Sequence, residues 1–363
     1  MEEEKPTIVV TGVSGNLGSR LLAHLSEFQV IGVDLVAPPP EHPCRFFAAL
    51  DLGEEESCRD LLLLLREFRP VAVVHLAFVM DQWQTEGTAT DRMWQINVAG
   101  TARVLEAISE ANRDGSIIQK FIFPSSVAVY GASLATPVTE DAPLAAHTLP
   151  YALHKMECDK VVRQRAPALQ GCSVYMLRPQ LFAGANARNY LVGALRGTPD
   201  GPSPRADRMR RAGKRLPCLL PFGKRYLHRQ MQFVHVDDVA RVIAHILRTS
   251  QPEAQRLTLL NLASRGEPLT FLRCAEIAHA RLRRVPGIWA FRLVLALLWK
   301  FGISSTPPEA APYLIGEYLL NTERLQKFLG AEYETVIRYQ VADAFRECFT
   351  TGTEASSQPS AAS

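Results

Sequence analysis

The sequence predicts an α/β protein of the Rossmann type: a doubly wound parallel sheet with a smaller substrate-binding lobe that is discontinuous in sequence. Strand-like runs at residues 7–11, 30–34, 71–76 and 117–123 alternate with amphipathic helical segments. That order is typical of βαβ units on one parallel sheet. A glycine triplet directly follows the first of these strands, at the turn where such sheets hold dinucleotide phosphates.

The composition sets limits on the class of protein. The chain has 363 residues, with 47% hydrophobic and 21% charged, which suits an ordinary globular core. A net charge of +3 gives no reason to expect a nucleic-acid partner. The seven cysteines lack paired spacing, so we expect neither a disulfide framework nor a metal site. They fit a reducing compartment, and the acidic start Met-Glu-Glu-Glu-Lys lacks a secretory pattern, so we expect a cytoplasmic location.

Within the sheet half, residues 71–76 are apolar apart from His75 and show no alternation, which predicts a central strand that is covered on both faces. Residues 61–65 read as a covering helix, because the apolar run continues to Phe68 and stops before Pro70. Sheet-like patterns return at residues 232–236 and 257–262.

A change in residue composition along the chain divides it into two parts. Gly, Pro and Arg accumulate over residues 184–229, which indicates an excursion away from the sheet. We predict an NAD-binding Rossmann domain from residues 1–180 and 231–262, and a substrate-binding lobe from residues 181–230 and 263–349. Residues 350–363 have almost no apolar mass and are predicted to form a disordered tail.

The most membrane-like stretch runs from Ile288 to Phe301. It is short and carries Arg292, so a core or lobe-packing helix is favoured over a span, and we expect no stable membrane insertion. An interfacial helix stays open as the alternative.

The glycine triplet consists of Gly12, Gly15 and Gly18, with a helix predicted to begin near Asn16 and Leu17. Gly12 permits a tight turn, Gly15 lets the backbone approach a pyrophosphate, and Gly18 allows close packing of helix on sheet. The free N–H groups at the helix start favour phosphates. The sequence therefore predicts a dinucleotide site, with a plain strand-turn-helix corner as the structural alternative.

Asp34 ends the second strand, close to the distance of roughly 20 residues after the glycines at which a carboxylate binds the adenosine ribose hydroxyls. An acid there repels a 2′-phosphate, and no Arg follows in Leu35-Val36-Ala37. We therefore expect NAD rather than NADP as the cofactor.

A second constellation combines Ser126, Tyr151 and Lys155. Ser126 follows the fifth strand at its carboxyl end, where such sheets bind ligands. Tyr151 and Lys155 form a Y-x-x-x-K, which places both on one helix face. A nearby ammonium and an oxidised nicotinamide both favour the phenolate, so we expect Tyr151 to be an acid/base and Ser126 to bind the same substrate oxygen.

Taken together, these motifs resemble those of the extended short-chain dehydrogenase/reductases, and in particular the NAD-dependent epimerase/dehydratase family, to about Gly330. Asn97, in Asn97-Val-Ala-Gly-Thr101, looks like the Asn-x-x-Gly-Thr helix of that family, with an internal polar group of a helix as the alternative. Leu177-Arg178-Pro179 and Phe233–Ala240 look like later landmarks. One carboxylate of the pair Asp237 and Asp238 is expected to cap a helix.

The resemblance implies further site residues and a reaction. Asp51 and Leu52 sit where the family lines the adenine, and Leu76 and Ala77 where it lines the central cofactor wall. A helix cap and a buried strand end are the structural alternatives. Hydride would move between nicotinamide and the carbon whose oxygen Ser126 and Tyr151 hold. The dehydratases carry acidic residues just after the catalytic Ser or Thr, whereas Val127 and Ala128 stand here, which disfavours dehydration.

We therefore expect an oxidoreductase or epimerase that acts on a hydroxyl or keto group of a small molecule, foremost a nucleotide sugar. Nine basic residues between Arg205 and Arg229 could neutralise its diphosphate, or form a solvated loop face. Two alternatives remain: a dehydrogenase of a hydrophobic alcohol or ketone such as a sterol or lipid, suggested by Trp289 and Phe291, and a non-catalytic NAD-binding regulator. The family commonly pairs through a helix bundle that includes the Tyr151 helix, so a homodimer is expected.

Overall fold

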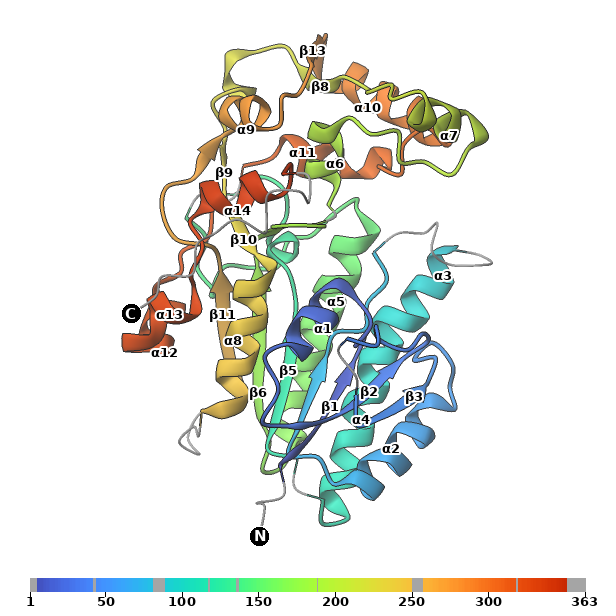
Figure 1. The fold of residues 1–363 in the computed structure, drawn as a ribbon, viewed down its shortest axis with the longest axis vertical. Helices are drawn as coiled ribbons and strands as arrows, with labels where there is room; N and C mark the ends of the chain where they lie inside the picture. Colours follow the sequence, from blue (N-terminus) through green and yellow to red (C-terminus); the bar gives the residue numbers. More distant parts are fainter. Residues whose placement is uncertain are drawn as a thin grey trace.

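The fold is taken from a computed structural model, which describes residues 5–41, 44–80, 89–116, 118–134, 137–187, 189–249, 257–317 and 319–350. Its centre is a seven-stranded sheet in the order β11-β6-β5-β4-β1-β2-β3, with every neighbouring pair parallel (Figure 1). The strands are β1 (Thr7–Thr11), β2 (Gln29–Asp34), β3 (Phe46–Ala49), β4 (Ala72–His75), β5 (Lys120–Pro124), β6 (Ser173–Pro179) and β11 (Leu257–Leu262). The predicted doubly wound α/β class is confirmed.

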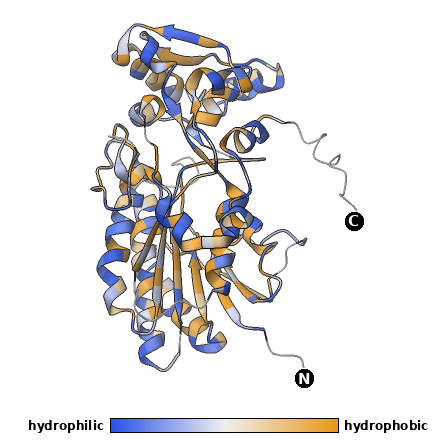
Figure 2. Cartoon of the chain, turned by 90° about the vertical axis from the view of Figure 1, so that its left-hand side faces the viewer, coloured by the Kyte–Doolittle hydropathy of each residue, from blue (hydrophilic) through white to orange (hydrophobic). Residues whose placement is uncertain are grey.

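Successive residues of the strands face opposite layers of helices, because side chains alternate along a strand. Ile8 and Val10 of β1 pack with α1 (Asn16–Leu22) and α8 (Val236–Arg248). Val9 lies in the other cluster, with α2 (Ser57–Phe68), α4 (Gly100–Arg113) and α5 (Pro150–Arg165). The hydrophobic colouring of the central strands in Figure 2 reflects this burial on both faces.

Helices from the end of the chain complete the first of these layers. Leu325 and Leu329 of α12 (Glu323–Leu329) are buried in the same cluster as Ile8 and Val10. Val336 of α13 (Tyr333–Val336) and the following Ile337 join them. The sheet half of the molecule is therefore finished by residues more than 60 positions beyond its last strand, β11.

The second part of the fold has its own core, formed by residues on both sides of β11 in sequence. Its helices are α6 (Tyr190–Arg196), α7 (Pro204–Arg211), α9 (Phe271–Ile277), α10 (Gly287–Lys300), α11 (Ala311–Ile315) and α14 (Val341–Glu347). Three two-stranded sheets accompany them: β7 (Leu181–Ala183) with β10 (Phe233–His235), β8 (Cys218–Pro221) with β13 (Leu282–Val285), and β9 (Gln230–Met231) with β12 (Leu269–Thr270). In Figure 1 this lobe lies above the carboxyl ends of the large sheet.

Most predicted elements lie where the sequence placed them, including the strands at 7–11 and 257–262 and the helix through Phe68. The pattern at residues 232–236 does form a strand, β10, but it pairs with β7 in a small sheet and not with the large one. The predicted tail at 350–363 lies outside the described residues apart from Thr350. Across the described ranges, every helix is too short or too polar to cross a bilayer.

Short helical turns connect these elements. They are α3 (Ala89–Trp94), a π-helix at Gln95–Ala99, and 3-10 turns at Val127–Tyr130, Ala166–Ala168, Lys224–Tyr226, Pro308–Ala310 and Gly330–Glu332. The π-helix and the turn at Val127–Tyr130 carry two of the predicted site residues, Asn97 and Ser126.

Candidate functional site

The glycine turn links β1 to α1 in a conformation that glycine permits best. Gly12 has φ +70°, and a Cβ there would lie 2.4 Å from the backbone nitrogen of Ala77. A Cβ on Gly18 would lie 2.4 Å from the Gly12 oxygen, so α1 packs directly on the turn. A Cβ on Gly15 would meet only the Gly12 oxygen, at 3.2 Å, so this position is the open one. The turn thus has room for a phosphate at Gly15 and at the first amides of α1, Asn16 and Leu17, which lack intrahelical acceptors.

Asp34 lies beside this turn at the end of β2. Its Oδ2 accepts a hydrogen bond of 3.0 Å from the Ser14 amide, and its Oδ1 accepts one of 2.7 Å from the Leu35 amide. The carboxylate is only partly buried, and the next two side chains, Leu35 and Val36, are exposed. This geometry can present acceptor oxygens to the hydroxyls of a ribose bound along the turn.

Four further predicted cofactor residues border the same edge of the sheet. Asp51 accepts a 2.8 Å hydrogen bond from the Gly53 amide and pairs with Arg92, so its carboxylate is already engaged within the protein. Leu52 is buried. Leu76 and Ala77 follow β4, and their amides donate to the carbonyl and hydroxyl of Thr11, respectively.

Asn97 is fully buried and sits in the π-helix at Gln95–Ala99. Its side-chain amide exchanges two 2.8 Å hydrogen bonds with the backbone of Val79, and Nδ2 also lies 3.3 Å from Nδ1 of His154. The backbone oxygen of Asn97 accepts from the Cys158 thiol. Asn97 therefore positions the segment after β4 against α5, which carries Tyr151.

Ser126 follows β5 and caps the 3-10 turn at Val127–Tyr130. Its hydroxyl accepts a 3.2 Å hydrogen bond from the Ala128 amide and also bonds the Tyr151 phenol. Val127 and Ala128 are both buried, so this turn offers no acidic side chain next to Ser126.

Tyr151 lies in the first turn of α5, where Pro150 provides the preset φ of a helix start. Burial raises the pKa of the Tyr151 phenol above its ordinary value, and the hydrogen bond with Ser126 opposes that rise. The phenol is thus held in its protonated form near neutral pH, in a water-poor position next to a hydroxyl. This pair can hold and protonate or deprotonate one substrate oxygen.

Lys155 is buried one turn further along α5. Its Nζ donates a 2.7 Å hydrogen bond to the Pro124 oxygen and lies 3.7 Å from the centre of the Phe78 ring. Burial lowers the pKa of Lys155 to about 8. The sequence suggested that the Lys155 ammonium acts on the Tyr151 phenol. In the structure, Nζ of Lys155 instead contacts the Pro124 oxygen and the Phe78 ring.

Phe78 is a site residue that sequence reasoning missed. Its ring meets the Tyr151 ring edge-on, with centroids 5.6 Å apart, and also covers the Lys155 ammonium. Its only sequence signal is its place directly after Ala77 at a strand end. An aromatic ring at that place gives the site an apolar wall that touches both residues.

A neutral histidine lies beneath the site in β4. Nδ1 of His75 lies 2.6 Å from the Thr11 hydroxyl, and Nε2 lies 3.1 Å from the Thr101 hydroxyl. Burial lowers the pKa of His75 to about 3, so the ring stays uncharged. It joins β1, β4 and α4 behind the glycine turn.

A buried ion pair supports the same region from the other side. Arg178 of β6 donates two 2.9 Å hydrogen bonds to the Asp159 carboxylate of α5, and both side chains are fully buried. Asp159 also accepts a 3.0 Å hydrogen bond from Ser125. The pair fixes α5 against the strand end that carries Ser126.

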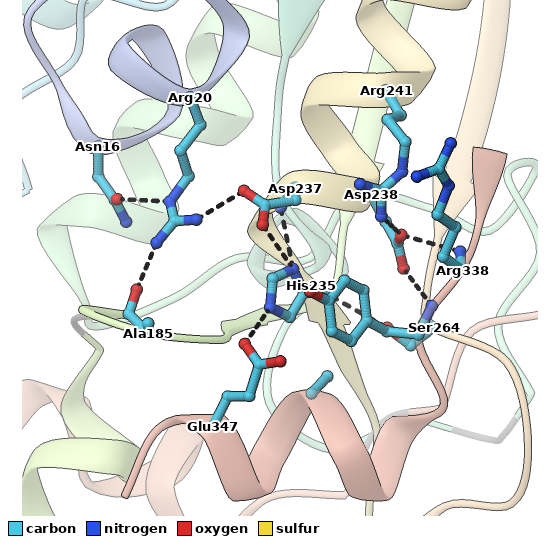
Figure 3. Close-up of polar contacts among 12 residues, drawn as sticks. Asn16, Arg20, Ala185, His235, Asp237, Asp238, Arg241, Ser264, Arg338 and Glu347 are labelled. Atoms are coloured by element: carbon cyan, nitrogen blue, oxygen red, sulfur yellow. Dashed lines mark hydrogen bonds and ion pairs between the residues drawn. The ribbon is translucent and has the colours of Figure 1, made fainter. Parts of the chain in front are cut away.

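The acidic pair after β10 has roles other than the expected helix cap (Figure 3). His235 caps α8, because its Nδ1 accepts from the Asp237 amide. Asp237 pairs instead with Arg20 of α1, and Asp238 accepts from the backbone of Arg338 and pairs with Arg241. The prediction that one of the two acids caps the helix is wrong, because the ring of the preceding histidine takes that position.

The basic residues between 205 and 229 do not gather at one point. Arg210 donates to the Pro199 and Gly201 oxygens, Arg215 to the Arg196 oxygen, and Arg229 lies over the Tyr226 ring. Arg205 and Arg208 are exposed on α7. Several of these cations therefore support the backbone of the lobe itself.

The comparisons with known proteins agree with this architecture. A family model described as "NAD dependent epimerase/dehydratase family" matches residues 8–259. A rice (Oryza sativa subsp. japonica) UDP-glucose 4-epimerase is 28% identical over 256 residues, which are 64% of this chain and 65% of that protein. A Bacillus subtilis UDP-glucose 4-epimerase is 24% identical over 273 residues, covering 69% of this chain and 76% of that one. The match spans less than two thirds of the rice protein's length.

Solved structures share the fold at lower identity. A UDP-glucose 4-epimerase from Thermotoga maritima, solved with UDP-glucose, has a TM-score of 0.65 at 18% identity and covers 94% of this chain and 97% of that chain. A UDP-glucuronic acid 4-epimerase from Bacillus cereus, solved with UDP-glucuronic acid and NAD, has a TM-score of 0.63 at 19% identity, with 94% and 98% covered.

Proposed function

This chain belongs to the NAD dependent epimerase/dehydratase family, and from that premise we propose that it is an NAD-dependent epimerase of a nucleotide sugar. The observation that carries the proposal is the placement of the Ser126 hydroxyl beside the Tyr151 phenol at the carboxyl end of the sheet. The relatives that match it are named UDP-glucose 4-epimerases, so we take a UDP-hexose as the first substrate to test.

The coenzyme site is proposed along the glycine turn, from residues that share the carboxyl edge of the sheet. Gly12 and Gly18 shape the turn, and Gly15, Asn16 and Leu17 would meet the pyrophosphate. Asp34 would bind the adenosine ribose and disfavour NADP. The remaining cofactor residues that we propose are Asp51, Leu52, Leu76, Ala77, Asn97, Tyr151 and Lys155.

The residues of the chain suggest how the reaction proceeds. NAD held at the glycine turn would supply a reversible acceptor for the hydride of a substrate carbon, and return of the hydride to the opposite face of that carbon would invert its configuration. Tyr151 takes the hydroxyl proton of that carbon as the ketone forms, and gives the proton back on the return step. Ser126 holds the same oxygen, and Lys155 steadies the nearby ribose. The buried Val127 and Ala128 supply no extra acid or base, which argues against loss of water.

The proposed division of labour follows the two parts of the fold. We propose that residues 1–180 and 231–262 bind the coenzyme, and that residues 181–230 and 263–349 hold the substrate. The packing of Leu325 and Ile337 with the sheet core supports moving residues 323–337 to the coenzyme part.

The assembly and location are proposals of the same kind. We propose a homodimer formed through α4 and α5, which pack side by side on one face of the sheet. The seven cysteines are all free, which supports a reducing compartment such as the cytoplasm. Sedimentation velocity of the purified chain tests the dimer.

The experiment for the function is turnover of UDP-glucose with added NAD. The expected result is UDP-galactose without net NADH. Tyr151→Phe should lower kcat by about 10²- to 10⁴-fold while NAD affinity changes little, because the lost hydroxyl acts on the substrate proton. Tyr333→Phe, on α13, is the matched control and should keep its activity.

Other outcomes separate the alternatives. Net NADH formation would indicate a dehydrogenase, and NAD binding without turnover of any nucleotide sugar would indicate a regulator. Full activity of Tyr151→Phe would rule out the assigned acid/base.

A further inference from the structure

Helix α10 turns large apolar side chains toward solvent. Trp289, Leu293, Leu297 and Phe301 follow one another at intervals of four, and their exposed fractions are 69, 51, 45 and 59%. Side chains four apart share one face of a helix, so these four form a continuous row, which we call the outer row. Ile288, one residue before Trp289 and four before Arg292, is 45% exposed in the neighbouring row. An apolar row of this length on a protein surface marks an interaction site.

The opposite face of α10 accounts for its packing in the lobe. Ala290, Phe291 and Leu295 are buried there, and Phe291 and Leu295 belong to the core of the lobe. The cavity behind the helix measures about 50 Å³. A ligand pocket usually needs about 300 Å³ or more, so the helix does not form the wall of a large internal site. Its apolar character on the outer row therefore serves something outside the lobe.

Cations accompany the outer row along the helix. Arg292 and Lys300 are exposed on α10, in a row beside the apolar one. Between Ile277 and Pro308 the sequence has five Arg and Lys residues and no Asp or Glu. The charged side chains of this stretch are therefore all basic, and the acids near it include Asp200, which accepts hydrogen bonds from Ser304 and Ser305, and Asp207 of α7, which pairs with Arg210 and Arg211.

More cations lie at the first end of the helix. The Phe222 amide donates a 2.9 Å hydrogen bond to the Val285 oxygen, which places β8 next to the start of α10. Phe222 is 61% exposed, and Lys224, Arg225 and Arg283 nearby are exposed as well. At this end of α10, as along the outer row, an exposed aromatic ring lies near exposed cationic side chains.

The far end of α10 has the same character. The Gly302 oxygen accepts a 3.0 Å hydrogen bond from the Ser203 amide, directly before α7. Arg205 and Arg208 of α7 are exposed there. In Figure 1, α10 and α7 lie at the outer end of the lobe, away from the large sheet.

We propose that the outer row of α10 and its basic surroundings dock on a membrane surface that contains anionic phospholipid, with α10 lying in the plane of the headgroups. Trp, Phe and Leu on one helix face, accompanied by Lys and Arg, are the pattern of helices that bind at such interfaces. The aromatic rings enter the boundary of the acyl chains, and the cations meet lipid phosphates and carboxylates. A second copy fits this face less well, since a symmetric dimer would bring Arg292 and Lys300 of both copies together.

The test is co-sedimentation of the full chain with vesicles. Vesicles of phosphatidylcholine and phosphatidylserine should bind the protein, and vesicles of phosphatidylcholine alone should bind it much less. Added salt should weaken binding, because it screens the charges. Brominated lipid should quench the fluorescence of the wild-type protein, and Trp289→Phe should remove most of that quenching.

Matched variants separate the outer row from general stickiness. Leu293→Gln with Leu297→Gln should weaken vesicle binding by at least about tenfold, because two partly exposed leucines no longer enter the interface. Leu63→Gln on α2, where Leu63 is 54% exposed, should bind like the wild type. Arg292→Gln with Lys300→Gln should reduce the preference for anionic lipid. The wild type and these three variants should have similar melting temperatures, since the changed side chains face solvent.

Three results would overturn the proposal. One is an absence of binding to anionic vesicles by the wild-type protein. Another is equal binding by the Leu293→Gln, Leu297→Gln double variant. The third is a lower sedimentation mass for the double variant than for the wild type, with neither protein binding vesicles. That result would assign the outer row to contact with a second copy of the chain.

Discussion

Arg20 joins the glycine-turn helix α1 to the start of α8, because its Nη1 lies 2.6 Å from Oδ1 of Asp237 (Figure 3). The same guanidinium donates to the Ala185 oxygen, just beyond β7, at 2.6 Å. One side chain therefore ties the proposed phosphate turn to the chain segment that leaves the large sheet for the lobe.

This pair should contribute measurably to stability. A double-mutant cycle with Arg20→Gln and Asp237→Asn should give a coupling of about 1 kcal/mol in urea unfolding, because both side chains are mostly buried. The exposed pair Arg59 and Asp60 is the control and should show almost no coupling. Equal couplings for the two pairs would contradict a joining role for Arg20.

Asp34 should set the choice between NAD and NADP. Asp34→Arg should weaken NAD binding by roughly 10- to 100-fold, since hydrogen bonds to a charged acceptor are lost, and should improve NADP relative to NAD. Titration calorimetry with both nucleotides measures the two affinities. Asp60→Arg, on the surface of α2, controls for the change in charge, and an unaltered NAD to NADP ratio in Asp34→Arg would refute the assignment.

Lys155 should titrate near pH 8 in the protein without coenzyme, because burial disfavours its charged form. A lysine in the unfolded chain has a pKa of about 10.4, so between about pH 8 and 10 the unfolded state holds more protons than the folded state. The free energy of unfolding should therefore rise as pH increases from about 8 to about 10. Below pH 8 both states hold the proton, and this contribution becomes constant. NMR of 13Cε-labelled lysine should show a resonance with this midpoint that disappears in Lys155→Met. Burial also lowers the pKa of Lys120, so the variant is needed for assignment.

Replacing only Arg178 of the buried pair Arg178 and Asp159 should lower the free energy of unfolding more than replacing both residues does. Arg178→Met removes the fully buried cation beside Asp159, leaves that carboxylate with the part-exposed Arg163 at 3.0 Å, and should lower the free energy of unfolding by about 3 kcal/mol. Adding Asp159→Asn should recover part of that loss. Arg66→Met, which breaks the half-exposed pair with Asp114, should cost less than about 1 kcal/mol in the same urea titration. Similar losses for Arg178→Met and Arg66→Met would count against this role.

The features that the sequence predicted well are those fixed by local geometry. The turn at Gly12 needs a positive φ, and the approach of α1 needs a bare Cα at Gly18, so the spacing alone reveals both. The placement of Ser126 beside Tyr151 depends on a strand end and a helix start that the pattern also located. Asp34 likewise lies at the end of a clearly apolar strand.

The features that the sequence did not reveal depend on contacts between distant segments. Phe78 covers Lys155 because the chain after β4 meets α5, which no periodicity encodes. His235 takes the helix cap because its ring folds back on the Asp237 amide, ahead of two residues with stronger capping preference. The strand β10 joins β7 because the chain has already left the large sheet there.

The packing of α12 and α13 against the large sheet has a consequence for the folding of the chain during synthesis and for the design of truncated fragments. Leu325, Leu329 and Ile337 complete a core whose strands end at Leu262. A fragment that stops after β11 would expose that apolar face and should aggregate when expressed alone. We therefore expect the core of the sheet half to be completed only once residues 323–337 have been synthesised, and a recombinant coenzyme-binding unit should need a fusion that joins these residues to β11.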